Sequence, residues 1–184
     1  MNHSPPRRRR LPVLFFLTVA MLPAVLAACG KGLEQYLSAE DRARPGRSRY
    51  VFHCSACHGK AGLGARRLFP PLAGSPWVNG PAEVPIRILL HGLEGELELK
   101  GERYMNKMPA VGDPLSDAIV AEVLTYVRAS FGNGAEAVRP EEVARLRTET
   151  STRGRAYTPR EIEAIFDSLT AGGDPREAGA GGLP

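Results

Sequence analysis

Cysteine is scarce in this chain, which has only Cys29, Cys54 and Cys57 among its 184 residues. Small domains held together by disulfides carry larger, even numbers of cysteines, so this count argues against a disulfide framework. The chain also has no internal repeat. The lone cysteine near the N-terminus and the later pair therefore need separate explanations.

Acidic residues are absent before Glu34, whereas a run of four arginines extends from Arg7 to Arg10. Removing residues 1–28 removes these four arginines and takes the formal net charge from +4 to zero. The high sequence pI of 9.2 is therefore misleading. A neutral remainder lacks the positive charge that nucleic-acid binding requires, so we expect no nucleic-acid partner.

The N-terminal segment has the order of a secretory signal. The arginine run precedes an apolar stretch at 11–25, and small residues then lead directly to Cys29. The sequence Leu-Ala-Ala-Cys at 26–29 resembles the lipobox of bacterial lipoproteins. This resemblance implies that Cys29 is lipidated and anchors the chain to a membrane, with several acyl chains giving stable attachment. The alternative is an uncleaved transmembrane helix, although Pro12 and Pro23 count against it. Both interpretations place the remainder in the bacterial cell envelope, facing the periplasm or the cell exterior.

The chain divides into five expected parts. These are a signal peptide at 1–28, a tether at 29–37, a globular domain at 38–133, a helical extension at 134–170 and a disordered tail at 171–184. The tail is rich in glycine and alanine, which is typical of disorder. The extension is rich in arginine and glutamate, a composition that fits either wrapping of the domain or binding of a partner.

Hydrophobic periodicity predicts an all-α domain with few helices and long loops. Helices are expected over 45–53, 84–91, 117–130, 140–147 and 159–169, with a loop over 59–74 and a hairpin-like stretch over 95–104. The clearest helix is 117–130, because Ser116 can cap its start and its apolar residues share one face.

The sequence Cys54-Ser-Ala-Cys57-His58 matches the pattern Cys-x-x-Cys-His. Two thiols one helical turn apart can each add to a vinyl group on the same side of a porphyrin, and the next residue then places an imidazole under the iron. The motif predicts one covalently bound haem, with His58 as an iron ligand. The alternatives are a thioredoxin-like redox pair, a zinc site or a structural disulfide. No βαβ pattern supports the first, and no second Cys/His pair supports the second.

Several segments together resemble class I cytochromes c. These are Gly46 with Tyr50-Val-Phe52 before the cysteine motif, Phe69-Pro-Pro-Leu-Ala-Gly74 after it, Tyr104-Met-Asn-Lys-Met-Pro109, and Leu124-Thr-Tyr-Val-Arg128. The resemblance covers about residues 45–131 and implies a cytochrome c-like helical domain around one covalent haem. In that family the last of these helices crosses the first, which implies close approach at Gly46 with Tyr126 at the contact.

The resemblance also implies roles for individual residues. A proline carbonyl accepts the N–H of the proximal histidine in this family, and Pro71 is the best match, with Leu72 packing on the haem. Met108 precedes Pro109, as the family's distal iron ligand precedes a proline. The hydrogen bond from His58 to the proline carbonyl would select the tautomer of His58 and raise its basicity as an iron ligand.

Other candidates for the sixth iron ligand are Met105 and His91. Met105 is expected to pack, because methionine fills irregular gaps. His91 lies near a helix C-terminus, where a polar or cationic side chain is favourable, and His53 is expected to point to solvent. A thioether ligand at Met108 stabilises ferrous iron and raises the reduction potential.

Three further residues each have two possible roles. Trp77 either shields the haem edge or packs in the domain, and we favour packing. Arg66 and Arg67 either contact a haem propionate or a partner, or form a solvated loop face.

An iron with both axial positions filled has no site for substrate, so we expect an electron carrier with redox protein partners rather than an enzyme. The alternative is the cytochrome subunit of a larger periplasmic dehydrogenase, nitrite reductase or terminal oxidase complex. A haem peroxidase or gas sensor would require a free or labile sixth position. The single Cys-x-x-Cys-His motif argues against a two-haem peroxidase.

Overall fold

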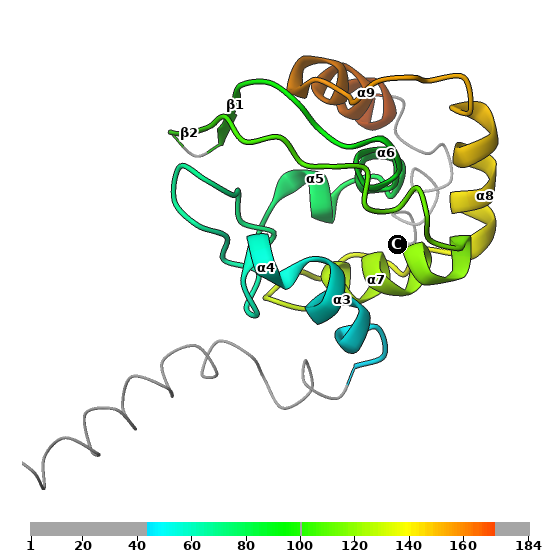
Figure 1. Cartoon of the computed structure of the whole chain (residues 1–184), viewed down its shortest axis with the longest axis horizontal. Coiled ribbons are helices and arrows are strands. Elements are labelled where there is room, and N and C mark those ends of the chain that lie inside the picture. The colour runs from blue at the N-terminus through cyan, green and yellow to red at the C-terminus, as the bar shows by residue number, and fades with distance from the viewer. Residues whose placement is uncertain (1–43, 100, 172–184) are drawn as a thin grey trace, which may run out of the picture. The chain divides into compact units, whose positions relative to one another are not determined.

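A computed structural model describes residues 44–99 and 101–171 of the chain (Figure 1). The expected signal peptide, the tether with Cys29 and nearly all of the expected tail lie outside the described residues. Within the described ranges, no helix combines the length and apolar character needed to cross a membrane.

The described part of the chain is mainly helical, as predicted. Its elements are α3 Arg47–His53, α4 Ser55–His58, α5 Pro76–Asn79, α6 Glu83–His91, β1 Leu97–Leu99, β2 Glu102–Tyr104, α7 Asp117–Ala129, α8 Pro140–Glu149 and α9 Pro159–Ala171. The long predicted helices are all present within a few residues of their expected ends. The sequence did not predict the single turn of α5, which begins at Pro76 and is followed by Gly80.

Strands β1 and β2 form a short antiparallel hairpin, in which Leu97 pairs with Tyr104 and Leu99 with Glu102. Both Leu97 and Tyr104 are buried. The hairpin-like stretch expected from the alternating leucines is therefore confirmed, and it turns an apolar edge toward the interior.

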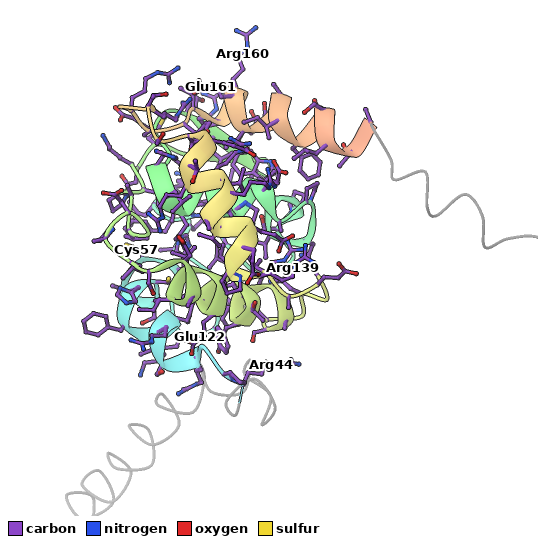
Figure 2. The ribbon with its side chains drawn as sticks, turned by 90° about the vertical axis from the view of Figure 1, so that its right-hand side faces the viewer. Arg44, Cys57, Glu122, Arg139, Arg160 and Glu161 are labelled. Carbon is purple, nitrogen blue, oxygen red and sulfur yellow. The ribbon has the colours of Figure 1, made fainter. Side chains whose placement is uncertain are left out.

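Helix α3 crosses α7 at a close contact between Gly46 and the α7 backbone. Gly46 has φ 84°, and a Cβ atom there would lie 2.5 Å from the carbonyl oxygen of Glu122 and 2.9 Å from the Cβ of Tyr126. Figure 2 shows Glu122 on α7 beside α3. The rings of Tyr50 and Tyr126 are 5.4 Å apart, and Phe131 packs 5.1 Å from Tyr50. The crossing expected from the family resemblance is therefore present.

The expected extension wraps the domain and shares its core. The main buried cluster joins α6, α7 and the extension, and consists of Ile86, Leu89, Leu90, Val120, Ala121, Leu124, Val138, Val143 and Leu146. A second cluster unites Val84 of α6 with Tyr157 and Ile162, and Figure 1 shows α9 lying across α6. Burial of these apolar side chains removes them from water and so fixes α8 and α9 to the domain.

Candidate haem site

The cysteine motif lies where helix α3 ends and the single turn of α4 begins. Cys54 leaves the helical conformation at φ −123°, yet its amide still donates to the Tyr50 carbonyl at 2.8 Å. The His58 amide in turn donates to the Cys54 carbonyl at 3.0 Å, so the two residues lie one helical turn apart. Gly59, with φ 73°, then ends the turn. The local backbone therefore gives the motif the helical spacing that haem attachment requires.

The two cysteines differ in exposure and are not joined by a disulfide. Cys54 is half-buried, whereas Cys57 is exposed. Burial, followed by the neighbouring Cys57, raises the pKa of the Cys54 thiol to about 12. Reactive redox thiols have lowered pKa values, because the thiolate is the nucleophile. The Cys54 environment therefore opposes the thioredoxin-like alternative.

His58 is buried and its ring is held by a loop carbonyl. Its Nδ1 lies 3.0 Å from the carbonyl oxygen of Pro70. A carbonyl can only accept a hydrogen bond, so Nδ1 must donate and Nε2 is left with a free lone pair. Burial lowers the pKa of His58, and the bond to Pro70 opposes that change. A neutral, oriented imidazole is the form that ligates iron.

The prediction that Pro71 supplies this carbonyl is wrong, because Pro70 does so. The loop is closed by the Leu72 amide, which donates to the Gly62 carbonyl at 2.8 Å. Gly64, with φ 67°, passes too close to Phe69 and Pro70 to carry a side chain. These contacts turn the Pro70 carbonyl toward His58. Pro71 and Leu72 instead line the cavity described next.

Two adjoining cavities meet at His58 and Met108, which line both of them. The larger encloses about 790 Å³, partly open to solvent, and the smaller about 500 Å³. Cys54 lines the larger cavity and Cys57 the smaller. Cofactor sites are concave and mostly apolar, and both cavities have this character.

The walls of the larger cavity are mainly apolar side chains. Helix α6 contributes Pro85, Ile88 and Leu89, helix α7 contributes Val123, Leu124 and Val127, and the segment around β1 contributes Leu93, Leu97 and Leu99. Leu124 and Val127 lie in a segment that resembles the family, whereas the only sequence signal of the others is their place on the apolar faces of predicted elements. With two thiols, one imidazole and one thioether at an apolar cavity, the residues present fit a covalently bound haem.

The other candidates for the sixth ligand, Met105 and His91, line neither cavity, and nor does His53. Met105 is 65% exposed. His91 Nε2 lies 2.6 Å from Thr150 Oγ1, in contact with the extension. His53 packs edge-on against Phe52 with ring centroids 4.8 Å apart. Among these residues and Met108, the structure places only Met108 at the cavities with His58.

Trp77 packs against the cluster formed by Val84, Tyr157 and Ile162, as expected, and it also lines the larger cavity. Arg66 and Arg67 are exposed and both pair with Glu102 of the hairpin, with the Arg67 pair at 3.5 Å. These arginines therefore tie the loop after the motif to β2.

The sequence matches known proteins over the same region. The family described as cytochrome c oxidase, cbb3-type, subunit III matches residues 41–127. Cytochrome c-552 of Thermus thermophilus is 32% identical over 120 residues, a match that covers 60% of this chain and 86% of that protein. The gluconate 2-dehydrogenase cytochrome c subunit of Pantoea cypripedii is 38% identical over 120 residues, covering 61% of this chain but 26% of that protein. The cytochrome c subunit of a quinone alcohol dehydrogenase from Gluconacetobacter polyoxogenes is 36% identical over 107 residues, with 22% of that protein covered. The chain belongs to the c-type cytochromes, which transfer electrons through covalently bound haem.

Proposed function

We propose that this protein is a one-electron carrier whose single haem is attached through Cys54 and Cys57 and ligated by His58 and Met108. The observation that carries the proposal is the placement of His58 and Met108 at the same two cavities, with the His58 ring already oriented by Pro70. When bound, the haem supplies an iron that alternates between the ferric and ferrous states.

The chain's own residues would set the properties of that iron. His58 offers Nε2 because its Nδ1 proton is engaged by Pro70. The soft thioether of Met108 would favour the ferrous state and raise the reduction potential. The apolar cavity walls would exclude water from the iron, while the exposed Cys57 marks the side where the cofactor approaches solvent and a redox partner.

We also propose that the domain works outside the cytoplasm on a lipid anchor at Cys29. The support is the order of the N-terminal segment, with its arginine run, its apolar stretch and its lipobox-like sequence. Labelling of cells with a radioactive fatty acid should mark the wild-type protein, and Cys29→Ser should abolish the label. An unlabelled wild-type protein would contradict the anchor.

A second candidate function is that of the cytochrome subunit of a larger redox complex. It is favoured by the relatives that are cytochrome c subunits of gluconate and alcohol dehydrogenases, although the matches span only small parts of those proteins. Such a chain would still carry electrons and would not itself be the enzyme. Purification from native membranes in mild detergent separates the two: a stable, stoichiometric dehydrogenase, nitrite reductase or oxidase partner supports the subunit, and isolation alone supports a free carrier.

The axial ligand assignment is tested by carbon monoxide binding to the reduced protein. We expect the wild type to ignore the gas, because Met108 occupies the sixth position. Met108→Ala should bind the gas and show a lowered reduction potential, whereas the exposed Met105→Ala should behave as the wild type. If Met108→Ala left the spectrum and the potential unchanged, the assignment of Met108 would be wrong.

A further inference from the structure

The segment that follows Met108 reaches helix α7 without regular secondary structure. Between Pro109 and Ser116 its backbone amides make turn contacts within the segment and one bond to α6, from the Gly112 amide to the Leu89 carbonyl at 2.8 Å. Val111 and Leu115 also pack against the main buried cluster. Such a segment has conformational freedom that ligation of iron by Met108 must restrict. What restrains it in the folded domain therefore bears on how firmly Met108 is held.

A single side chain of the extension, Arg147 of α8, holds this segment and the start of α7 through four acceptors. Its Nε donates to Asp117 Oδ1 at 2.8 Å, and its Nη1 donates to the Asp113 carbonyl at 3.1 Å. Its Nη2 donates to the Leu115 carbonyl at 2.8 Å and to the Gly112 carbonyl at 3.3 Å. Planar guanidinium donors suit such a multiple contact, and a cationic donor strengthens each bond. Arg147 thus joins the segment after Met108 to the start of α7.

The extension also reaches Met108 indirectly, through two isolated backbone bridges that share Leu93. Met108 and Leu93 exchange backbone hydrogen bonds of 2.8 and 3.0 Å. Leu93 forms a parallel bridge to Tyr157, and the Glu94 amide donates to the Tyr157 carbonyl at 2.8 Å. A Cβ atom at Gly92 would lie 2.5 Å from the Met108 carbonyl oxygen, so this pairing leaves no room for a side chain. The backbone of Met108 is therefore held by Leu93, and the segment that follows Met108 is held by Arg147.

We propose that Arg147 is a positioning residue for Met108, through which the extension holds the distal ligand against the iron and keeps the reduction potential high. This inference rests on the proposed ligation by Met108. Arg147 has no contact with the cavities and acts only through the segment that follows the ligand. Loss of its bonds would raise the fraction of protein in which Met108 is displaced and the sixth position is open.

The test uses the mature, haem-loaded protein with Arg147→Gln and a matched control, Arg145→Gln. Both substitutions remove one positive charge from α8, so any general effect of charge on the potential is shared. Arg145 instead pairs with Glu83 and Glu149, away from the segment after Met108. Carbon monoxide binds only the open form, so its apparent affinity for the reduced protein reports the open fraction directly.

We expect Arg147→Gln to bind carbon monoxide at least about tenfold more tightly than Arg145→Gln, because several bonds from a charged donor are lost together. Its reduction potential should fall below that of the control, and the ferric Met-ligated absorption band should weaken. Arg147→Lys keeps the charge but not the planar fork, so an intermediate gas affinity is expected. Because this variant disturbs packing least, it keeps the test decisive if Arg147→Gln does not fold.

Met108→Ala provides the reference for a fully open site and separates two failures. If Met108→Ala gains no gas binding, the ligand assignment itself is wrong. If Met108→Ala opens the site but Arg147→Gln and Arg147→Lys match Arg145→Gln in gas affinity and potential, Arg147 serves only the fold and the inference is overturned.

Discussion

Substitution of Gly46 tests whether the crossing of α3 and α7 requires direct backbone contact. An added methyl group would lie 2.5 Å from the Glu122 carbonyl oxygen, an atom of the α7 backbone that cannot rotate away. The positive φ of 84° adds a second cost, because side-chain-bearing residues in the left-handed region lose about 1–2 kcal/mol. Forcing a methyl group into a packed contact costs about 1–3 kcal/mol more. We therefore expect Gly46→Ala to lower the free energy of unfolding by about 3 kcal/mol.

Two other glycines separate these contributions. Gly132 has φ 78° and nothing within 4 Å of an added Cβ, so Gly132→Ala should show the backbone cost alone, about 1 kcal/mol. Gly134 has open space and no positive φ, so Gly134→Ala should change stability by less than about 1 kcal/mol, in either direction.

Guanidinium unfolding of the haem-loaded proteins, followed by circular dichroism, measures all three variants on one scale. At about 3 °C per kcal/mol for a domain of this size, Gly46→Ala should also melt roughly 10 °C below the wild type. If Gly46→Ala costs no more than Gly132→Ala, the two helices can separate freely and the close crossing does not stabilise the domain.

Two further predictions concern helix α9. Glu161 accepts hydrogen bonds from Arg155 and from the Thr158 amide, which together hold its pKa far below the ordinary 4.5. A carboxyl group with a depressed folded pKa stabilises the fold above its unfolded pKa and loses that contribution as the pH falls through the folded value. Glu161→Gln should therefore cost about 1 kcal/mol in urea unfolding at neutral pH and progressively less below pH 4.5, whereas a constant difference from wild type would contradict this account. Ile162 is fully buried against Val84 and Tyr157, so Ile162→Ala should cost about 3 kcal/mol in the same assay, and a loss below about 1 kcal/mol would mean that α9 packs loosely.

The cysteine motif could be identified from the sequence because its chemistry is local. The positions of Cys54, Cys57 and His58 along one helical turn follow from their spacing, whatever the rest of the fold does. The ends of the main helices could also be predicted. Ser116, for example, caps α7 by accepting a hydrogen bond from the Ile119 amide at 3.4 Å. Both kinds of prediction depend on neighbours in the chain.

The carbonyl that orients His58 depends instead on the path of a whole loop. Pro70 and Pro71 are adjacent and chemically alike, and successive carbonyls in an extended chain point in opposite directions. Only the bonds that close the loop, such as that from the Leu72 amide to Gly62, decide which carbonyl faces the histidine. A one-residue error was therefore unavoidable from a pattern of two prolines.

The contacts of the extension could not be predicted for a related reason. Helix α8 buries only Val143 and Leu146, three residues apart, which is too narrow an apolar stripe to be distinguished from a solvated helix by composition. The acceptors of Arg147 are mostly backbone carbonyls, which leave no trace in the residue types of segment 112–115.

The narrow apolar stripe of α8 and the hydrogen bonds of Arg147 are connected by the geometry of this helix. Val143 and Leu146 are both fully buried in the cluster shared with α6 and α7, which fixes the rotation of α8 about its own axis. Arg147 follows Leu146 directly and is thereby turned about 100° from the core, toward the segment after Met108. A change that loosens the packing of Leu146 would also move the guanidinium of Arg147. Leu146→Ala should therefore raise carbon monoxide affinity as well as lower stability, whereas Ile162→Ala on α9 should lower stability with a smaller effect on gas binding. Equal effects on gas binding at equal stability would show that general loosening, rather than the orientation of α8, controls the distal ligand.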